Sequence, residues 1–201
     1  MNKLICIPIT ETTTVTFLQA IQEAAKLADI IELRLDYLSE DDLTELLAVL
    51  PGQELSKPLL FTFRPREQGG MRDLTRDDRL QFWQGLSNET KKLITLADFE
   101  LDLVEHLANQ TPPLPWSKII CSNHNFDETP ANLNEIYERI ARTSAAVIKI
   151  ATKVNRIADC LPLFDLMQRG EKPVVVLGMG LPGIATRILA LSRSALLTFG
   201  S

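Results

Sequence analysis

The sequence reads Ala145-Ala146-Val147-Ile148-Lys149-Ile150-Ala151 at residues 145–151, an apolar run with one lysine inside it. Short apolar runs that are rich in β-branched residues and bounded by polar segments are typical of parallel strands covered on both faces. A lysine in such a strand must reach solvent, pair with buried carboxylates, or lose its proton and become a nucleophile. The run therefore predicts a buried strand and leaves these three roles of Lys149 open.

Strand-like runs and amphipathic helical patterns alternate along the sequence on both sides of this run. Eight strands are expected, at 4–9, 30–35, 59–63, 94–101, 118–122, 145–151, 173–177 and 195–199. Helical patterns separate them, over 12–28, 39–50, 77–86, 104–107, 129–140, 156–168 and 184–192. Strict alternation of this kind predicts an α/β protein with a (β/α)₈ TIM barrel, and a doubly wound open sheet is the alternative.

The end of the sequence does not complete such a barrel. Residue 201 follows directly on the eighth strand-like run, so we expect the eighth loop and helix to be missing from this chain. Barrels of this class typically need about 250 residues. Either the chain is truncated or the barrel is completed in another way. No linker, repeat or low-complexity segment interrupts the pattern, and we expect a single domain over residues 1–201.

Composition excludes several classes of protein. A net charge of −5 gives no basic surface for nucleic acid or for an anionic membrane. No signal peptide is visible, and no apolar run approaches the roughly 18 residues of a membrane span. The three cysteines, Cys6, Cys121 and Cys160, are odd in number and are expected to be buried free thiols in a reducing compartment. These observations predict a cytoplasmic protein.

Polar side chains gather where the expected strands end, which is where barrel enzymes carry their active sites. They are Glu32, Arg34 and Asp36 on the second strand, Arg64 after the third, Asp98, Glu100 and Asp102 on the fourth, His124 after the fifth and Lys149 in the sixth, and the apolar Met179 follows the seventh. The spacing of two within a strand places each set on one face. The leucines between them, Leu33 and Leu35, are then expected to face the helices, so the charged set points inward.

Each of these residues also has a plainer interpretation. The carboxylates and arginines could form rim charges or structural ion pairs, His124 could be a hydrogen-bonded loop residue, and Met179 could serve packing alone. A metal site is not expected, because His124 has no histidine partner at ligand spacing and the cysteines are dispersed. Taken together, a lysine near a histidine, arginines and carboxylates suits amine catalysis on an anionic, hydroxylated ketone.

These residues give the chain a resemblance to the type I 3-dehydroquinate dehydratases, the 3-dehydroquinases of the shikimate pathway of aromatic amino acid biosynthesis. The resemblance runs from the first strand to the end of the chain, and seven segments carry it. They are Glu32-Leu33-Arg34-Leu35-Asp36, Phe61-Thr62-Phe63-Arg64 with Gly69-Gly70, Asp98-Phe99-Glu100-Leu101, Ser122-Asn123-His124-Asn125-Phe126 with Thr129-Pro130, Lys149-Ile150-Ala151, Gly178-Met179-Gly180 with Gly183 and Thr186-Arg187, and Leu197-Thr198-Phe199-Gly200-Ser201.

The resemblance implies a lyase that removes water from 3-dehydroquinate by syn elimination, without metal or cofactor, and yields 3-dehydroshikimate. By motif, Lys149 would form a Schiff base with the ring ketone, and His124 would be the general acid and base. The implied substrate contacts are the carboxylate with Arg187, the ring hydroxyls with Glu32, Arg34 and Arg64, and the carbocycle with Met179 and Phe199. The implied partner is this small molecule.

Two departures from the family pattern stand out. Gln68 occupies the position where the family usually has a glutamate before the glycine pair, so it can hydrogen-bond a substrate hydroxyl but brings no charge. The chain also ends before the lid loop with a Ser-Ala-Pro-Gly-Gln-like segment that follows strand eight in the family. Some members are fused to shikimate dehydrogenase, so a longer parent chain is one alternative, and a homodimer is another open arrangement.

Two other functions remain open from sequence. One is another Schiff-base barrel, a class I aldolase, although Arg187 in a carboxylate-type motif argues against a sugar phosphate substrate. The other is a truncated, inactive barrel domain. The retained Lys149, His124 and Arg187 favour catalysis, whereas the missing end favours its loss.

Overall fold

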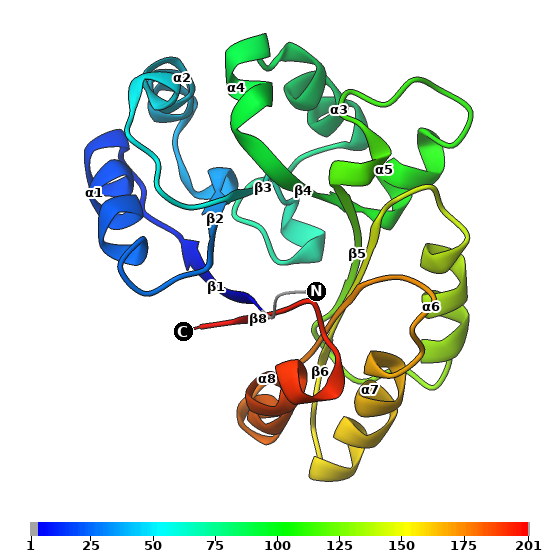
Figure 1. The fold of residues 1–201 in the computed structure, drawn as a ribbon. Coiled ribbons are helices and arrows are strands. Elements are labelled where there is room, and N and C mark those ends of the chain that lie inside the picture. The colour runs from blue at the N-terminus through cyan, green and yellow to red at the C-terminus, as the bar shows by residue number, and fades with distance from the viewer. Residues whose placement is uncertain (1–3, 201) are drawn as a thin grey trace.

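The structure is a computed structural model that describes residues 4–200 and shows eight parallel strands curled into a nearly closed barrel with helices around it (Figure 1). The strands are β1 (Leu4–Ile9), β2 (Ile30–Arg34), β3 (Leu59–Thr62), β4 (Ile94–Glu100), β5 (Ile119–Asn125), β6 (Val147–Lys153), β7 (Val174–Met179) and β8 (Leu197–Phe199). They neighbour one another in the order β7-β6-β5-β4-β3-β2-β1-β8. Since β1 pairs with both β2 and β8, the sheet curls round as the predicted barrel does and stays unpaired between β7 and β8 alone among the described strands.

The seam of the barrel lies between β7 and β8. On its outer edge β8 pairs with β1 over three positions, from Leu4 opposite Leu197 to Cys6 opposite Phe199. Within residues 4–200, β7 and β8 are not paired as strands, and the backbone N–H of Leu196 donates to Val174 O across the gap at 2.8 Å. The wall of the barrel is therefore held more weakly here than between the other strands.

Eight α-helices lie in the described residues, and polar caps start half of them. They are α1 (Thr14–Ala24), α2 (Glu40–Val49), α3 (Arg76–Gly85), α4 (Asn88–Leu93), α5 (Leu101–His106), α6 (Leu133–Ala141), α7 (Cys160–Met167) and α8 (Ile184–Leu189). The side chains of Thr13, Ser39, Thr75 and Ser87 each accept the backbone N–H three residues on, which satisfies an otherwise unpaired donor at the first turn. Both α3 and α4 lie between β3 and β4. After β8 only Gly200 is described.

Single turns of 3₁₀ helix join several of these elements. They are Leu35–Tyr37, Leu50–Gly52, Arg66–Gln68, Trp116–Lys118, Ile157–Asp159, Leu181–Gly183 and Ala190–Arg193. The first of them replaces the expected end of strand two, because β2 stops at Arg34 and Asp36 lies in the turn. The third brings Gln68 to the end of β3, next to the barrel mouth.

Two of the other expected boundaries were wrong, and one helix was not expected. Strand five was expected to end at Ser122 but β5 continues to Asn125, because its polar end pairs with β6 as far as Asn125 opposite Thr152. A helix was expected to open at Thr129-Pro130, but α6 begins at Leu133, since the Thr129 hydroxyl is engaged with Lys153 O (2.9 Å). Helix α4 was not expected, because its six residues are mostly polar and carry no apolar periodicity.

The apolar core has two layers, as alternating strand residues dictate. One cluster fills the space between strands and helices and includes Leu33, Leu35 and Trp83, so the expectation that these leucines face the helices is confirmed. The second cluster lies inside the barrel and comprises Cys6, Ile30, Leu60, Ile120, Val147, Val175 and Leu197. The three cysteines are free and buried, as expected. Among the described helices, none has the length and apolar character needed to cross a bilayer.

Candidate active site

A cavity of about 330 Å³ opens at the ends of the strands and collects the residues singled out from sequence. Its wall includes Glu32, Arg34, Arg64, Gln68, His124, Lys149, Met179, Arg187 and Phe199. These side chains come from six strands or from the turns directly after them, and from α8. The structure therefore brings together all nine residues that the sequence proposed for the site.

Lys149 projects into this cavity from the middle of β6. Its register is fixed on both sides, with Ser122 of β5 and Val175 of β7 directly opposite. The side chain is buried, and Nζ donates to Asp98 Oδ2 at 2.6 Å and lies 3.9 Å from Glu32 Oε1. Nζ also lies 4.8 Å from the centre of the Phe199 ring. Of the three roles open from sequence, the structure shows the lysine paired with buried carboxylates.

Asp98 binds both Lys149 and Arg64. Arg64 Nη2 donates to the same oxygen, Oδ2, at 2.7 Å, and both side chains are buried. Burial alone would raise the pKa of the Asp98 carboxyl, but the adjacent Arg64 and Lys149 cations outweigh it and lower that pKa well below its ordinary value. The other oxygen, Oδ1, is buried and has no hydrogen-bond partner among the described residues. Asp98 is thus a permanent anion at the base of the cavity.

His124 lies near the end of β5, on the cavity wall. Its backbone N–H donates to Gln68 Oε1 at 3.0 Å, and Arg64 Nη1 lies 3.1 Å from ring atom Nδ1. The ring stacks on Phe126 with a plane angle of 11°. Loss of solvent contact, followed by the Arg64 and Lys149 cations, lowers the pKa of His124 well below its ordinary value. The imidazole is therefore neutral at physiological pH.

The loop that carries Gln68 is pressed against β3, and this requires glycine at two positions. Gly69 has φ +84°, and a Cβ there would come within 2.2 Å of the Phe126 ring. A Cβ on Gly70 would come within 1.9 Å of Arg64 O. The glycine pair thus allows the turn to place Gln68 beside His124.

Two further polar side chains, those of Glu32 and Arg34, line the cavity from β2. Arg34 is clamped by Asp36 through two parallel hydrogen bonds, Nε to Oδ1 at 2.9 Å and Nη2 to Oδ2 at 2.8 Å. Glu32 accepts a hydrogen bond from Thr62 Oγ1 at 2.7 Å. The expectation that both face inward is confirmed, and Asp36 joins them from the turn after the strand.

The opposite wall of the cavity is less charged. Met179 ends β7, Phe199 ends β8 and Arg187 lies on α8, and all three are half-buried. The Arg187 guanidinium forms no ion pair with any residue between 4 and 200. Arg187, without an ion pair in the described part of the chain, thus lines a cavity that has apolar surfaces beside it.

Known proteins show which family has this arrangement. The family model described as type I 3-dehydroquinase matches residues 5–201. The chain belongs to the type I 3-dehydroquinase family. A 3-dehydroquinate dehydratase of Methanococcus vannielii is 31% identical over 201 residues, which are 98% of this chain and 89% of that protein.

Two further comparisons describe other members of this dehydroquinase family. The bifunctional 3-dehydroquinate dehydratase/shikimate dehydrogenase of Arabidopsis thaliana is 31% identical over 98% of the chain, and the chain spans 33% of that longer protein. A crystal structure of type I 3-dehydroquinate dehydratase from Clostridium difficile with covalently modified comenic acid is 27% identical, with a TM-score of 0.82. That match covers 98% of this chain and 83% of the other.

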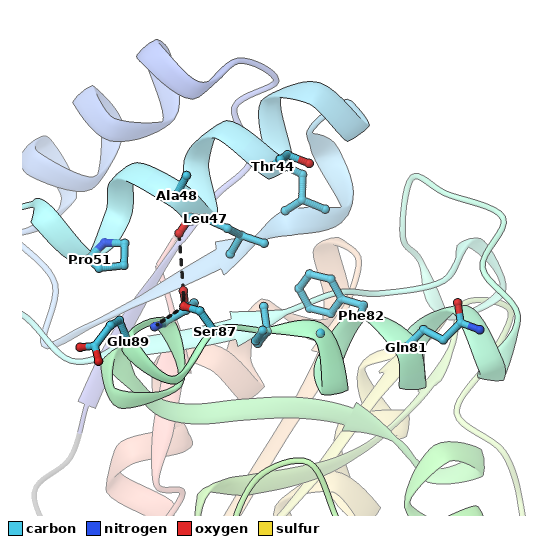
Figure 2. Close-up of a pocket in the computed structure, with 12 residues that line it drawn as sticks. Thr44, Leu47, Ala48, Pro51, Gln81, Phe82, Ser87 and Glu89 are labelled. Carbon is cyan, nitrogen blue, oxygen red and sulfur yellow. Dashed lines mark hydrogen bonds between the residues drawn. The ribbon is translucent and has the colours of Figure 1, made fainter.

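A second, larger cavity lies on the outside of the dehydroquinase barrel. Its volume is about 600 Å³, and Figure 2 shows it between α2 on one side and α3 and α4 on the other. Leu47 and Phe82 contribute to its wall, and Thr90 Oγ1 donates to Leu47 O at 3.5 Å. Glu89, an exposed residue, is the one charged side chain among its lining residues. Of these two cavities, the one at the barrel mouth therefore holds nearly all of the charged side chains.

Ionic contacts continue outward from Arg64 to the surface. Arg64 Nη1 lies 3.4 Å from Glu100 Oε1, and Arg79 Nη1 donates to Glu100 Oε2 at 2.7 Å. Arg79 Nη2 in turn donates to Asp102 Oδ2 at 2.6 Å. Asp102 was expected on the inward face of strand four, but this was wrong, because β4 ends at Glu100 and Asp102 lies in α5 with its side chain half exposed.

Sequence reasoning missed the roles of Asp98 and Arg79. Asp98 was noted by its spacing with Glu100 but was not chosen as a site residue, because no pattern in the sequence joins it to Lys149 across the barrel. Arg79 comes from α3, four residues before the fully buried Trp83 and so on the same helix face. A buried arginine one turn from a buried tryptophan was the available signal.

Burial makes Glu100 a pH-dependent element of stability. It raises the pKa of this carboxyl to about 7, although Arg64 and Arg79 oppose the rise. A carboxyl whose folded-state pKa is raised stabilises the fold below its ordinary pKa, and that stabilisation is lost as the pH rises through about 7. We therefore expect the free energy of unfolding to fall by up to about 3 kcal/mol from this group between roughly pH 5 and pH 8.

The measurement is urea denaturation at a series of pH values. Glu100→Gln should flatten the fall with rising pH, because the amide does not titrate. Glu105→Gln, which removes an exposed carboxylate paired with Arg139, is the matched control and should keep the slope of the parent. An unchanged slope in Glu100→Gln would show that the fall comes from another group.

Proposed function

We propose that this chain is a lyase that converts 3-dehydroquinate to 3-dehydroshikimate through a Schiff base on Lys149. The observation that carries the proposal is the position of Lys149 Nζ, buried in a cavity between Asp98, Glu32 and the Phe199 ring. Membership of the type I 3-dehydroquinase family and relatives named 3-dehydroquinate dehydratase support the substrate. The step belongs to the shikimate pathway of aromatic amino acid biosynthesis.

The proposed reaction begins when the Lys149 ammonium gives one proton to His124 and the free amine attacks the ring ketone. Two protons pass in all from the nitrogen to the ketone oxygen, which becomes the water that leaves. A carbinolamine forms and loses water, which leaves a protonated imine. This cation withdraws electrons from the neighbouring C–H bond and acidifies it. His124 then takes that proton and delivers it to the hydroxyl on the next carbon, which leaves as water. Hydrolysis of the imine returns the ketone and frees the lysine, so atoms and protons balance without metal or cofactor.

The other residues of the cavity would hold the substrate. Arg187 is the proposed partner of the carboxylate, supported by its position on the cavity wall and by the lack of an ion pair to its guanidinium within residues 4–200. The ring hydroxyls would contact Glu32, Arg34, Arg64 and Gln68, and the carbocycle would pack on Met179 and Phe199. Asp98 would stabilise the positive charge on the lysine nitrogen before and after the imine forms.

Borohydride reduction tests the proposal directly, because it converts an imine into a stable secondary amine. The chain is incubated with 3-dehydroquinate and borohydride, and intact mass and peptide mapping locate the product. We expect one adduct, on Lys149. A sugar phosphate as the only substrate trapped there would favour the class I aldolase alternative. An adduct on a different lysine, or none on the folded protein, would contradict the proposal.

His124→Ala should still form the imine but should slow turnover by about 10²-fold or more, since a positioned acid–base group contributes that much. The rate of dehydroshikimate formation is followed by absorbance under saturating substrate. His106→Ala, which removes the other histidine of the chain from the surface of α5, is the control and should match the parent. Equal rates for both variants would remove His124 from its proposed role.

A further inference from the structure

The His124 ring has two polar neighbours at one nitrogen, and they require different protonation states. Arg64 Nη1 lies 3.1 Å from Nδ1, and a guanidinium only donates, so this contact needs an unprotonated Nδ1. Gln68 Oε1 lies 3.3 Å from the same atom and can accept only from a protonated Nδ1. The two contacts therefore belong to two tautomers of the neutral ring.

The orientation of the Gln68 amide is fixed, so it does not resolve this conflict. Its Oε1 accepts the backbone N–H of His124 at 3.0 Å, which keeps the oxygen, and not the amide nitrogen, beside the ring. Arg64 makes the shorter contact of the two and carries a positive charge, which strengthens its hydrogen bond to Nδ1. The geometry favours the tautomer with the proton on Nε2.

The preference for a proton on Nε2 depends on which other hydrogen-bond acceptors compete for the protons of Arg64 Nη1. Three acceptors surround its two protons: His124 Nδ1, Ser122 Oγ at 3.3 Å and Glu100 Oε1 at 3.4 Å. The carboxylate of Glu100 is the strongest competitor by charge, yet it makes the longest contact. Its second oxygen is held at 2.7 Å by Arg79, which lies on the outer layer of the barrel.

Arg79 is itself held in place. It is buried, and its two terminal nitrogens donate to Asp102 at 3.0 Å and 2.6 Å. Its position on the same face of α3 as Trp83 fixes the start of this connection against the barrel wall. The contacts thus run without a gap from α3 through Glu100 and Arg64 to the histidine in the cavity.

We propose that Arg79 is a positioning residue for His124: by holding Glu100, it leaves Arg64 Nη1 free to donate to Nδ1 and keeps the proton of the neutral ring on Nε2. His124 lines the cavity, and no described residue hydrogen-bonds to Nε2. In this tautomer the ring presents an N–H donor to a substrate oxygen, which suits polarisation of a ketone during attack by Lys149. For His124 to act as a base through Nε2, the ring proton must instead lie on Nδ1, where it faces Gln68.

The catalytic consequence rests on the proposed function, but the tautomer does not, and it can be measured without substrate. The chain has two histidines, so ¹⁵N-histidine labelling gives two rings, and His106→Gln assigns them. At about pH 8 we expect the His124 ring of the parent to show Nδ1 as an unprotonated nitrogen and Nε2 as a protonated one. A parent ring protonated on Nδ1 would overturn the proposal at once.

At a pH well above the raised pKa of Glu100, where its carboxyl is ionised, Arg79→Met should release Glu100 to take Arg64 Nη1, so that the His124 proton shifts toward Nδ1 and Gln68. The expected kinetic effect is a fall on the order of 10-fold in the rate of imine formation, the step in which the Nε2 proton polarises the ketone, with KM changed by less than about 2-fold. Adding Glu100→Gln to Arg79→Met removes the competing charge and should restore the parent tautomer. Arg139→Met, which removes a surface arginine paired with Glu105, is the control and should leave the ring unchanged.

The outcomes are separable from those of the proposed function. A tautomer that is the same in the parent and in Arg79→Met would overturn the role of Arg79 even in an active enzyme. The expected tautomers in a chain that forms no imine would contradict only the proposed function. If Arg79→Met does not fold, Arg79→Gln takes its place. Because the glutamine amide can still donate to Glu100, the proposal then requires a smaller shift of the His124 proton toward Nδ1.

Discussion

Lys149→Ala is expected to lose both borohydride trapping and turnover with 3-dehydroquinate. No other amine occupies the cavity among the described residues, so no imine can form on the bound ketone, and the neighbouring C–H bond keeps its ordinary acidity. Intact mass and a stopped assay of dehydroshikimate measure the two losses in parallel. The rate should drop to that of the uncatalysed reaction.

The matched control for this change lies four residues further on the same strand. Lys153 ends β6, and its side chain does not line the cavity, so Lys153→Ala should keep both trapping and turnover. Circular dichroism and a thermal melt verify that each variant is folded. Retained trapping in Lys149→Ala, on any other lysine, would refute the assignment of the nucleophile.

Arg64→Met is expected to destabilise the protein by about 3–5 kcal/mol and to abolish activity. The change leaves Asp98 with Lys149 alone and Glu100 with Arg79 alone, deep in the barrel, and an incompletely paired buried charge costs this much. It also removes the donor to His124 Nδ1. Urea denaturation measures the loss of stability, and the dehydration assay measures the loss of activity.

Arg66→Met tests whether the effect is specific to the buried arginine. Arg66 lies two residues away and pairs with Asp73 on the surface, where both side chains are largely exposed. Exposed ion pairs contribute little, so this variant should unfold at nearly the same urea concentration as the parent. Equal destabilisation by the two variants would mean that the buried ionic cluster is not a major source of stability.

The sequence predicted the barrel because its local patterns and its global fold agree. Leu33 and Leu35 alternate with Glu32 and Arg34, and a period of two on a strand requires one set to face the helices and the other to face the barrel axis. The same rule placed the polar residues of the site at the ends of their strands. All nine proposed site residues were therefore found together, although they come from distant parts of the chain.

The pairing of these residues could not be predicted in the same way. Asp98 and Lys149 are 51 positions apart, and their 2.6 Å contact depends on which strands meet across the barrel and at what height. Spacing indicates a face but not a partner. Arg79 was missed for a related reason, because it reaches Glu100 from the helix layer, and periodicity within α3 does not show which strand lies beneath it.

Boundaries failed where hydrogen bonds to β6, from the backbone in one case and from a side chain in the other, outweighed local propensity. His124 lies in a strand and not after it, because β5 is extended by its ladder to β6 in spite of a polar sequence. Thr129 has the features of a helix start, but its hydroxyl bonds to β6 and delays α6 to Leu133. Both departures lie beside the cavity, where sequence and fold agree least.

The unpaired seam between β7 and β8 links local motion of the barrel wall to the environment of Lys149. β8 is short and has a strand ladder on one side only, with β1, so its amide protons should exchange with solvent sooner than those of β5 or β6, which are paired on both sides. The strand that fluctuates in this way carries Phe199, whose ring covers Lys149 Nζ at 4.8 Å. Each opening of β8 would therefore admit water to the lysine and weaken its attraction to Asp98 by raising the local dielectric constant. We therefore expect the opening of β8 to set how often solvent reaches Lys149 from this side of the barrel.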